Sequence, residues 1–340
     1  MKYKKKIIFR ADGNSKTGLG HLYRIFALIE MLKENYEYVL ITRADSELII
    51  IPKSYSVEVI PSKISITEEP DWLLEKYETT NSIVIADGYA YDSNYQKSIK
   101  KVGYKLIYID DLTATEMFAD VVINHSLVVK PEHFKAKPET EFALGSHYAM
   151  LRPKFIEIAK KSKQPSNVKE VFVSFGGADF YDLTSKAVRA LTNLNYVKKI
   201  HVLIGAANKH KNIYKIEEEN SNVVIHKNLP EAEVLDVMEK CQLAIVPSST
   251  ISYEVCSVKM LVICGYFIDN QELIYNGLRE KKVIFPAGDF THYDVIRFER
   301  VINEAIELDM TEQNEMLRNQ KTLFDGNQKE RFLDIINRIN

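Results

Sequence analysis

The chain has 340 residues, a length that favours two domains of ordinary size over one small module. Its 45 Lys and Arg residues stand against 47 Asp and Glu residues, and the formal net charge of −2 gives no overall electrostatic attraction to nucleic acid or to an anionic membrane. Apolar residues make up 46% and charged residues 27%, which excludes the disordered and fibrous classes.

The spacing of the cysteines and the short first apolar run are typical of a cytoplasmic protein. Cys241, Cys256 and Cys264 form no C-x-x-C pair, which argues against a disulfide framework or a zinc ribbon. The first apolar run is only three residues long, Ile7-Ile8-Phe9, whereas a secretory h-region needs roughly 7–15 residues and a membrane span about 20. We therefore expect a cytoplasmic protein that binds neither nucleic acid nor a membrane.

Short β-rich apolar runs alternate with amphipathic stretches through the first half of the chain. The spacing of apolar residues predicts strands at 6–9, 38–42, 57–60, 82–86, 105–109 and 119–123, and helices at 21–33, 70–77 and 91–102. This alternation predicts a parallel sheet that helices cover on both faces.

The same pattern begins again after a polar, proline-containing run at 160–167, which we interpret as a linker. Strands are predicted at 170–175, 199–204, 223–226, 243–246 and 261–264. One helix is predicted to follow Gly176-Gly177 and to end at Leu191, and further helices are predicted at 208–219, 230–240, 250–257, 270–280, 293–308 and 312–338. The chain is therefore predicted to form two Rossmann-like, doubly wound α/β domains, at 1–160 and 168–310, with a helical extension at 311–340. Ligands of such sheets bind beyond the carboxyl ends of the strands, so we expect a site in an interdomain cleft.

The first strand–helix turn carries the clearest chemistry. Gly18 and Gly20 allow a close approach of the backbone to a ligand just before a helix N-terminus, where free N–H groups attract anions. The spacing fits neither a dinucleotide fingerprint nor a P-loop. His21 lies in the first turn of that helix and is either a general base or a locally packed histidine.

Three turns of the second half could hold a nucleotide. The Gly176-Gly177 pair offers backbone N–H groups to a pyrophosphate or is simply a tight turn. Ser248 and Ser249 begin a helix, where their hydroxyls can cap it or bind phosphate, and Glu254 one turn later could accept from a ribose diol. Asn270 follows the next strand in a stretch that resembles a helix N-cap.

No His, Cys, Asp or Glu cluster has the spacing of a metal site. The one adjacent acidic pair at a strand end, Asp110-Asp111, is either a turn or a substrate contact. We expect neither a metal nor a cofactor.

Eight segments, in order, resemble the UDP-sugar hydrolases of pseudaminic acid biosynthesis, which act on UDP-2,4-diacetamido-2,4,6-trideoxy-β-L-altropyranose. These segments are FRADGNSKTGLGHLYR at 9–24, DGY at 87–89, IDD at 109–111, VVINHS at 121–126, YAMLRPKF at 148–155, SFGGAD at 174–179, PSSTISYE at 247–254 and DNQ at 269–271. That family is related to the peptidoglycan UDP-N-acetylglucosamine transferase, so the resemblance implies a GT-B-like fold. Family members often carry His where this chain has Gly88.

The resemblance implies that His21 activates water for an inverting attack at C1 of the sugar, without a metal. It places Arg10, Asp12, Gly20, Tyr89 and Arg152 on the sugar side, and Gly176, Gly177, Ser248, Ser249, Glu254 and Asn270 on the UDP side.

Two alternatives stay open. A glycosyltransferase of the same fold would move the sugar to an acceptor and usually exposes an apolar or basic docking patch in its amino-terminal half. The run at 48–52, LIIIP, could be such a patch, although a buried strand explains it more simply. The second alternative is a non-catalytic protein that binds nucleotide sugars, against which His21 weighs.

Overall fold

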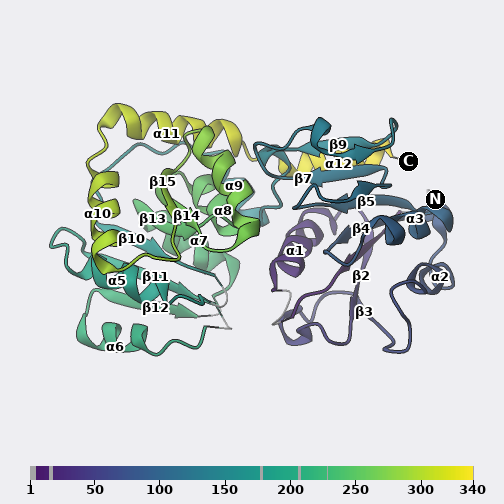
Figure 1. The fold of residues 1–340 in the computed structure, drawn as a ribbon, viewed down its shortest axis with the longest axis horizontal. Helices are drawn as coiled ribbons and strands as arrows, with labels where there is room; N and C mark the ends of the chain where they lie inside the picture. Colours follow the sequence, from purple (N-terminus) through teal and green to yellow (C-terminus); the bar gives the residue numbers. More distant parts are fainter. Residues whose placement is uncertain (1–4, 15–17, 177–178, 206–207, 228, 340) are drawn as a thin grey trace. The chain divides into compact units, whose positions relative to one another are not determined.

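The computed structural model describes residues 5–14, 18–176, 179–205, 208–227 and 229–339. It divides into two compact units, each built around its own parallel sheet (Figure 1). Unit 1 comprises Met1–Pro153 and Asn327–Asn340, and unit 2 comprises Lys154–Gly326. The predicted α/β class with parallel sheets is confirmed.

Unit 1 contains a seven-stranded sheet in the order β3-β2-β1-β4-β5-β7-β9, and all the pairings are parallel. The residues of the central strands β1 and β4 are almost all buried, because helices cover both faces of a parallel sheet. The strands are β1 (Lys6–Ala11), β2 (Glu37–Arg43), β3 (Val57–Ile60), β4 (Ser82–Asp87), β5 (Lys105–Ile109), β7 (Val121–Asn124) and β9 (Glu141–Leu144), with a separate pair β6 (Glu116–Met117) and β8 (Lys135–Ala136).

The helices of unit 1 connect these strands. They are α1 (Gly20–Leu32), α2 (Glu69–Leu74), α3 (Ser93–Lys101) and α12 (Gln328–Arg338), with 3₁₀ turns η1 (Leu48–Ile50), η2 (Thr79–Asn81), η3 (Pro131–His133) and η4 (Ser146–Tyr148). Helix α3 begins where the Asp92 carboxylate accepts from the N–H groups of Asn94 and Tyr95, which is a side-chain N-cap.

Unit 2 contains a six-stranded parallel sheet in the order β12-β11-β10-β13-β14-β15. Its strands are β10 (Glu170–Val173), β11 (Lys199–Ile204), β12 (Val223–Lys227), β13 (Leu243–Pro247), β14 (Leu261–Tyr266) and β15 (Phe285–Asp289). Its helices are α4 (Pro153–Ala159), which begins at the last residue of unit 1, α5 (Leu183–Thr192), α6 (Asn212–Glu219), α7 (Glu231–Lys240), α8 (Thr250–Val258), α9 (Asp269–Glu280), α10 (Val295–Ile306) and α11 (Met310–Leu323).

One face of the unit 2 sheet carries a large apolar core. Val171 and Val173 of β10 and Ile200 and Val202 of β11 all belong to it, because alternate residues of a strand point to the same face. His201, between the last two, is buried on the opposite face.

The strand order places a topological switch point in each unit, between β1 and β4 in unit 1 and between β10 and β13 in unit 2. At such a point the two connections leave toward opposite faces and open a crevice beyond the carboxyl ends of the strands. Ala11, the last residue of β1, pairs with Asp87, the last residue of β4. The loops that follow these two strands therefore begin side by side.

The carboxyl-terminal segment differs from the predicted extension at 311–340. The predicted helix at 312–338 is two helices: α11 ends before Gly326, which has φ of +78°, and α12 follows as part of unit 1. Figure 1 shows α12, in yellow, beside the teal strands of unit 1. The ring of Phe332 in α12 packs against Tyr148 of η4 at 6.3 Å, and Lys329 pairs with Glu34.

The first domain boundary also lies earlier than expected, between Pro153 and Lys154, so the predicted linker at 160–167 belongs to unit 2. There the ammonium group of Lys163 donates to the carbonyl oxygen of Cys241 at 2.9 Å. Polar composition predicted an irregular segment correctly but could not show that tertiary contacts hold it against one unit.

Four strands of the described residues were not predicted: the short pair β6 and β8, and the strands β9 and β15. Strands β9 and β15 lie at sheet edges, and β15 contains Pro286 and Gly288, residues that usually argue against a strand but are tolerated at an edge.

The run at 48–52 is not a buried strand: Leu48–Ile50 forms the turn η1, and the side chain of Ile49 is 87% exposed.

Candidate active site

The general-base candidate of unit 1 is held by a buried carboxylate. His21 is the second residue of α1, and its Nδ1 lies 2.7 Å from Oδ1 of Asp87, which is fully buried at the end of β4. The neighbouring strand β5 leads into Asp111, whose carboxylate pairs with Arg24 one turn beyond His21. Residues from α1, β4 and the loop after β5 thus meet at the carboxyl edge of the sheet.

Counting hydrogens assigns the tautomer of His21. Arg24 Nη2 lies within 2.8 Å of Asp87 Oδ1, Asp111 Oδ2 and His21 Nδ1, but it carries only two hydrogens. Carboxylate oxygens are the stronger acceptors for both, so the His21 Nδ1 carries its own hydrogen and donates it to Asp87. The lone pair of Nε2 is then available to accept a proton, which is the arrangement a histidine base requires.

The electrostatics of this cluster favour a charged carboxylate. Burial alone would raise the pKa of Asp87, but the charges and hydrogen bonds of Arg24 and His21 outweigh it and lower the pKa from 3.8 to about 2. Two carboxylates face one guanidinium, so the cluster can stabilise a positive charge that develops on the imidazole when it accepts a proton.

Tyr89 and His125 lie beside this cluster. The ring of Tyr89 meets the His21 ring edge-on, with centroids 4.7 Å apart and planes at 86°, and its side chain is 46% exposed. His125 is buried, and burial, with a smaller contribution from Arg24, lowers its pKa to about 4. His125 therefore stays neutral at physiological pH.

The other predicted sugar-side residues lie in different environments. Arg10 is completely buried and paired with Glu69, so it does not reach solvent, while the Asp12 side chain is 22% exposed. Gly20 is the exposed first residue of α1, and a Cβ there would meet nothing within 4 Å. Arg152 is half-buried near Tyr23, which points from a different side of α1 than His21 does.

The predicted UDP-side residues gather at the carboxyl edge of the unit 2 sheet. Ser249 is the N-cap residue of α8, yet its side chain makes no capping hydrogen bond, so its hydroxyl remains available. Glu254 lies one turn further on and is 5% exposed, and Asn270 is the exposed second residue of α9. These are the positions that could contact a nucleotide.

Two predicted UDP-side features have structural roles. The hydroxyl of Ser248 is fully buried within 3.0 Å of the carbonyl oxygens of Gly265 and Gln271, so it fixes the loop rather than reaching a ligand. Gly176 has φ of +77°, which a glycine adopts without strain. Gly177 lies outside the described residues.

The N-terminus of α5 is already occupied. The Asp179 carboxylate accepts from the N–H groups of Leu183 and Thr184 at 2.8 and 2.9 Å, and Asp179 is buried. These two N–H groups are therefore not available to a pyrophosphate. The start of α8, which has no side-chain cap, is the better anion site in unit 2.

The residues that hold the unit 1 site together have no recognisable motif in the sequence. Asp87 and Arg24 lie in the quoted segments but were assigned no role, Asp111 was interpreted only as part of a turn or a substrate contact, and Glu69 lies in none of the segments. The only signal available was position, since Asp87 and Asp111 each follow a predicted strand. Their convergence depends on the strand order, which the sequence does not state.

The described residues contain no group of three or more His, Cys, Asp or Glu side chains that could hold a metal ion. Asp111 pairs with Arg24, and Asp110 accepts from the N–H of Thr113 at 2.8 Å and the amide of Asn124 at 3.2 Å.

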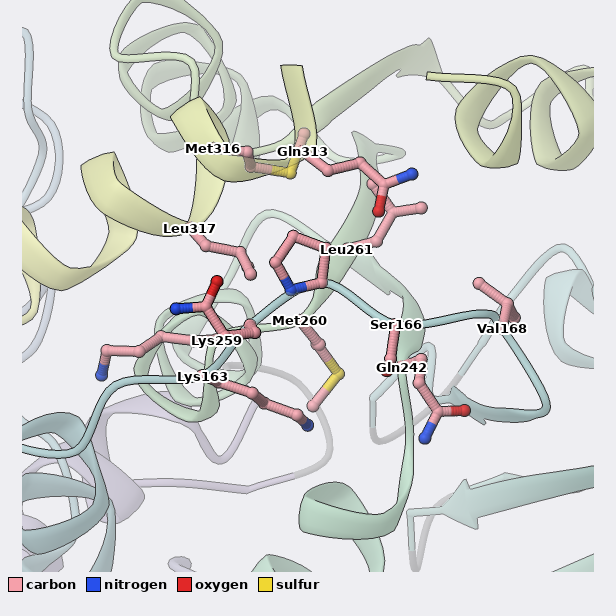
Figure 2. Close-up of a pocket in the computed structure, with 12 residues that line it drawn as sticks. Lys163, Ser166, Val168, Gln242, Lys259, Met260, Leu261, Gln313, Met316 and Leu317 are labelled. Atoms are coloured by element: carbon pink, nitrogen blue, oxygen red, sulfur yellow. The ribbon is translucent and has the colours of Figure 1, made fainter. Parts of the chain in front are cut away.

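Figure 2 shows a small cavity of unit 2 that is lined by none of the predicted UDP-side residues. It is lined by the 163–168 segment, the amino ends of β13 and β14, and α11, and its volume of about 20 Å³ is enough for roughly one water molecule. It is too small for a nucleotide sugar and lies at the opposite edge of the sheet from Ser249.

Comparison with known proteins agrees with this architecture. The MurG structure of Acinetobacter baumannii superposes with a TM-score of 0.66 at 12% identity, covering 98% of this chain and 99% of that one. Arabidopsis thaliana UGT89C1, complexed with UDP-L-rhamnose, gives 0.65 at 12% identity, covering 98% of each chain. The chain has a GT-B fold.

Sequence relatives of this GT-B protein are distant. The uncharacterized protein MJ1062 of Methanocaldococcus jannaschii is 25% identical over 81% of this chain, but the match spans only 58% of MJ1062. The UDP-2,4-diacetamido-2,4,6-trideoxy-beta-L-altropyranose hydrolase of Campylobacter jejuni is 23% identical over 81% of this chain and 97% of its own length. The resemblance predicted from the sequence is thus confirmed, although no protein-family model matches. Within the part of the chain that the structure describes, we find no helix long and apolar enough to cross a membrane.

The buried carboxylate generates a prediction for acid stability. Because the pKa of Asp87 is lowered from 3.8 to about 2 by folding, its contribution, on the order of 2 kcal/mol, is present above pH 4 and is lost as the pH falls toward 2. Asp87→Asn should therefore lower the free energy of unfolding at pH 7, and the difference from wild type should shrink between pH 4 and 2. Urea unfolding across that range measures it. A difference that stays constant with pH would contradict the lowered pKa.

Proposed function

We propose that the chain is an enzyme that hydrolyses a UDP-linked amino sugar at C1, releasing UDP and the free sugar. The His21–Asp87 pair, 2.7 Å apart at the carboxyl edge of the unit 1 sheet, is the observation that carries this proposal. The Campylobacter jejuni relative supports UDP-2,4-diacetamido-2,4,6-trideoxy-β-L-altropyranose as the substrate, and therefore a role in pseudaminic acid biosynthesis.

In the proposed reaction, the Nε2 atom of His21 accepts a proton from a water molecule while the water oxygen forms a bond to C1. The bond between C1 and the diphosphate oxygen breaks, UDP leaves with the electron pair, and the anomeric centre inverts. Asp87 holds the ring through Nδ1 and stabilises the imidazolium as it forms, as the orienting carboxylate does in other histidine-based sites.

Unit 2 is proposed to bind UDP. The uncapped N-terminus of α8 and the hydroxyl of Ser249 would donate to the diphosphate, where the helix dipole favours negative charge. Glu254 would accept from the ribose hydroxyls, and Asn270 would lie beside the nucleotide. Donors fixed in this way stabilise the charge of the departing UDP.

A glycosyltransferase is the second candidate. Both solved structures compared above share the fold at high coverage, and Ile49, 87% exposed in unit 1, leaves an apolar side chain that an acceptor could contact. Incubation with a panel of UDP-sugars in the absence of acceptor separates the two: a hydrolase releases UDP and reducing sugar in equal amounts, whereas a strict transferase releases neither.

The base assignment predicts that His21→Ala retains UDP binding and loses at least about 10²-fold in kcat, the usual scale for removing a general base. UDP affinity measured by calorimetry shows whether the variant still binds the nucleotide. Asp87→Asn, which keeps the imidazole but removes the charge behind it, should lie between wild type and His21→Ala. Near-wild-type turnover by His21→Ala would remove His21 from this role.

The nucleotide assignment predicts that Glu254→Ala weakens UDP binding by about 1.5–3 kcal/mol, the range for hydrogen bonds to a charged group. Glu218→Ala, an exposed carboxylate on α6 of the same unit, is the matched control and should leave UDP affinity unchanged. Equal affinities for the Glu254 variant and wild type would contradict the ribose contact.

A metal-independent reaction predicts that excess EDTA changes kcat by less than about threefold. Removing a Lewis-acid metal would cost several kcal/mol of transition-state stabilisation and would lower kcat far more. The reason is that Asp110 and Asp111 already accept from Thr113, Asn124 and Arg24, while neutral donors and a helix start are proposed to face the diphosphate. Loss of activity in EDTA, restored by Mg²⁺, would overturn this prediction.

A further inference from the structure

A second ionic cluster lies at the same edge of unit 1, beside the His21 site. Glu69, the first residue of α2, is completely buried although it is a carboxylate. Burying an ionised group is costly unless it is paired and hydrogen-bonded, and removing one partner of such a pair is strongly destabilising. The partners of the Glu69 carboxylate are therefore held in fixed positions.

Glu69 holds the guanidinium of Arg10 from one side. Arg10 Nε donates to Glu69 Oε1 at 2.6 Å and Nη2 donates to Oε2 at 3.1 Å, a fork geometry that fixes the plane of the guanidinium. Tyr95 and Arg43 donate to the same carboxylate at 2.6 and 3.1 Å. Arg10 is completely buried and its guanidinium is hydrogen-bonded on both sides, so its side chain cannot move toward a ligand.

The remaining arm of Arg10 fixes Asp12. Arg10 Nη1 donates to Asp12 Oδ1 at 2.7 Å, and the same oxygen accepts from the N–H of Arg43 at 2.8 Å and the hydroxyl of Thr42 at 3.1 Å. Ser46 adds a fourth contact at 3.3 Å. Oδ1 is therefore saturated with donors, and the carboxylate cannot rotate without breaking several hydrogen bonds.

The other oxygen of Asp12 accepts fewer hydrogen bonds. Within the described residues, Oδ2 accepts one hydrogen bond, from the hydroxyl of Tyr91 at 3.2 Å, and the Asp12 side chain is 22% exposed. An ionised carboxylate oxygen can accept about two hydrogen bonds, so one acceptor position remains. Asp12 directly follows β1, whose last residue pairs with Asp87, so this oxygen lies on the same sheet edge as the base.

We propose that Glu69 is a positioning residue that acts through Arg10 to hold Asp12 Oδ2 as an acceptor for a hydroxyl or amide N–H of the sugar. This inference rests on the proposed function, since it assigns a sugar contact to the same substrate. It also explains why Arg10, which lies too deep to contact a ligand, occupies the end of β1.

The test compares the affinities of two ligands that differ only in the sugar. Calorimetry measures UDP and UDP-2,4-diacetamido-2,4,6-trideoxy-β-L-altropyranose on proteins that carry His21→Ala, so that the ligand is not consumed. Glu69→Gln keeps the shape of the side chain and removes the charge that holds Arg10. It should weaken binding of the UDP-sugar about tenfold, the loss expected for one hydrogen bond to a charged group, and leave UDP affinity unchanged.

A double-mutant cycle tests the route through Asp12. Asp12→Asn should also weaken the UDP-sugar about tenfold, and the Glu69→Gln/Asp12→Asn double variant should lose about tenfold rather than a hundredfold, because both changes remove one contact. Glu58→Gln, a carboxylate on β3 of unit 1 that pairs with Lys76, is the matched control and should change neither affinity. If Glu69→Gln does not fold, Arg10→Lys replaces it, since a lysine cannot bridge Glu69 and Asp12 as a fork.

The outcomes are separable. Unchanged affinity for the UDP-sugar, equal weakening of both ligands, or additive losses in the double variant would each overturn the positioning role. A shift for the sugar ligand alone supports it even if the wild-type protein fails to hydrolyse that sugar, in which case the hydrolase proposal fails by itself. If neither ligand binds, both proposals fall.

Discussion

The contact between the buried carboxylate of Asp87 and the groups of α1 is the interaction on which the unit 1 site depends. Asp87 ends the central strand β4 with no exposed surface, and it is stable there because Arg24 and His21 supply charge and hydrogen bonds. In doing so it fixes α1 against the sheet and assigns the proton of the imidazole. A single buried charge thus sets both the position of the helix and the chemistry of its histidine.

The two ionic clusters of unit 1 follow from one feature of the sheet. In a parallel sheet all strands end at the same edge, and the register of Ala11 with Asp87 places the loops after β1 and β4 next to each other. The Asp87–Arg24–Asp111 cluster holds His21, the proposed base, and the Glu69–Arg10–Asp12 cluster holds the proposed acceptor oxygen of Asp12. Each cluster uses buried arginines as fixed forks, which position oxygen atoms more precisely than flexible lysines would.

The corresponding edge of unit 2 has a different character. Asp179 closes the start of α5 and Ser248 is engaged with backbone carbonyl groups, so the available donors are the N-terminus of α8 and the hydroxyl of Ser249. Neutral donors at a helix start suit an anion, whereas paired carboxylates and a histidine suit proton transfer and recognition of hydroxyl groups. This division agrees with a proposed reaction in which one unit binds the diphosphate and the other supplies the base.

The sequence by itself determined the alternation of strands and helices, the existence of two parallel-sheet units and the turns at which chemistry was expected, because apolar periodicity and glycine-rich strand ends are local properties. It could not determine the strand order, and therefore could not show that Asp87 and Asp111 meet at His21 and Arg24. The burial of Glu69 could not be predicted for the same reason, because its partner Arg10 is distant in the chain and no local pattern distinguishes a buried carboxylate from an exposed one. The tertiary structure also decided that α12 returns to unit 1 and that Arg10 lies beneath the surface. Contacts between residues far apart in sequence, rather than local preference, set which charges are buried and which atoms remain free to act.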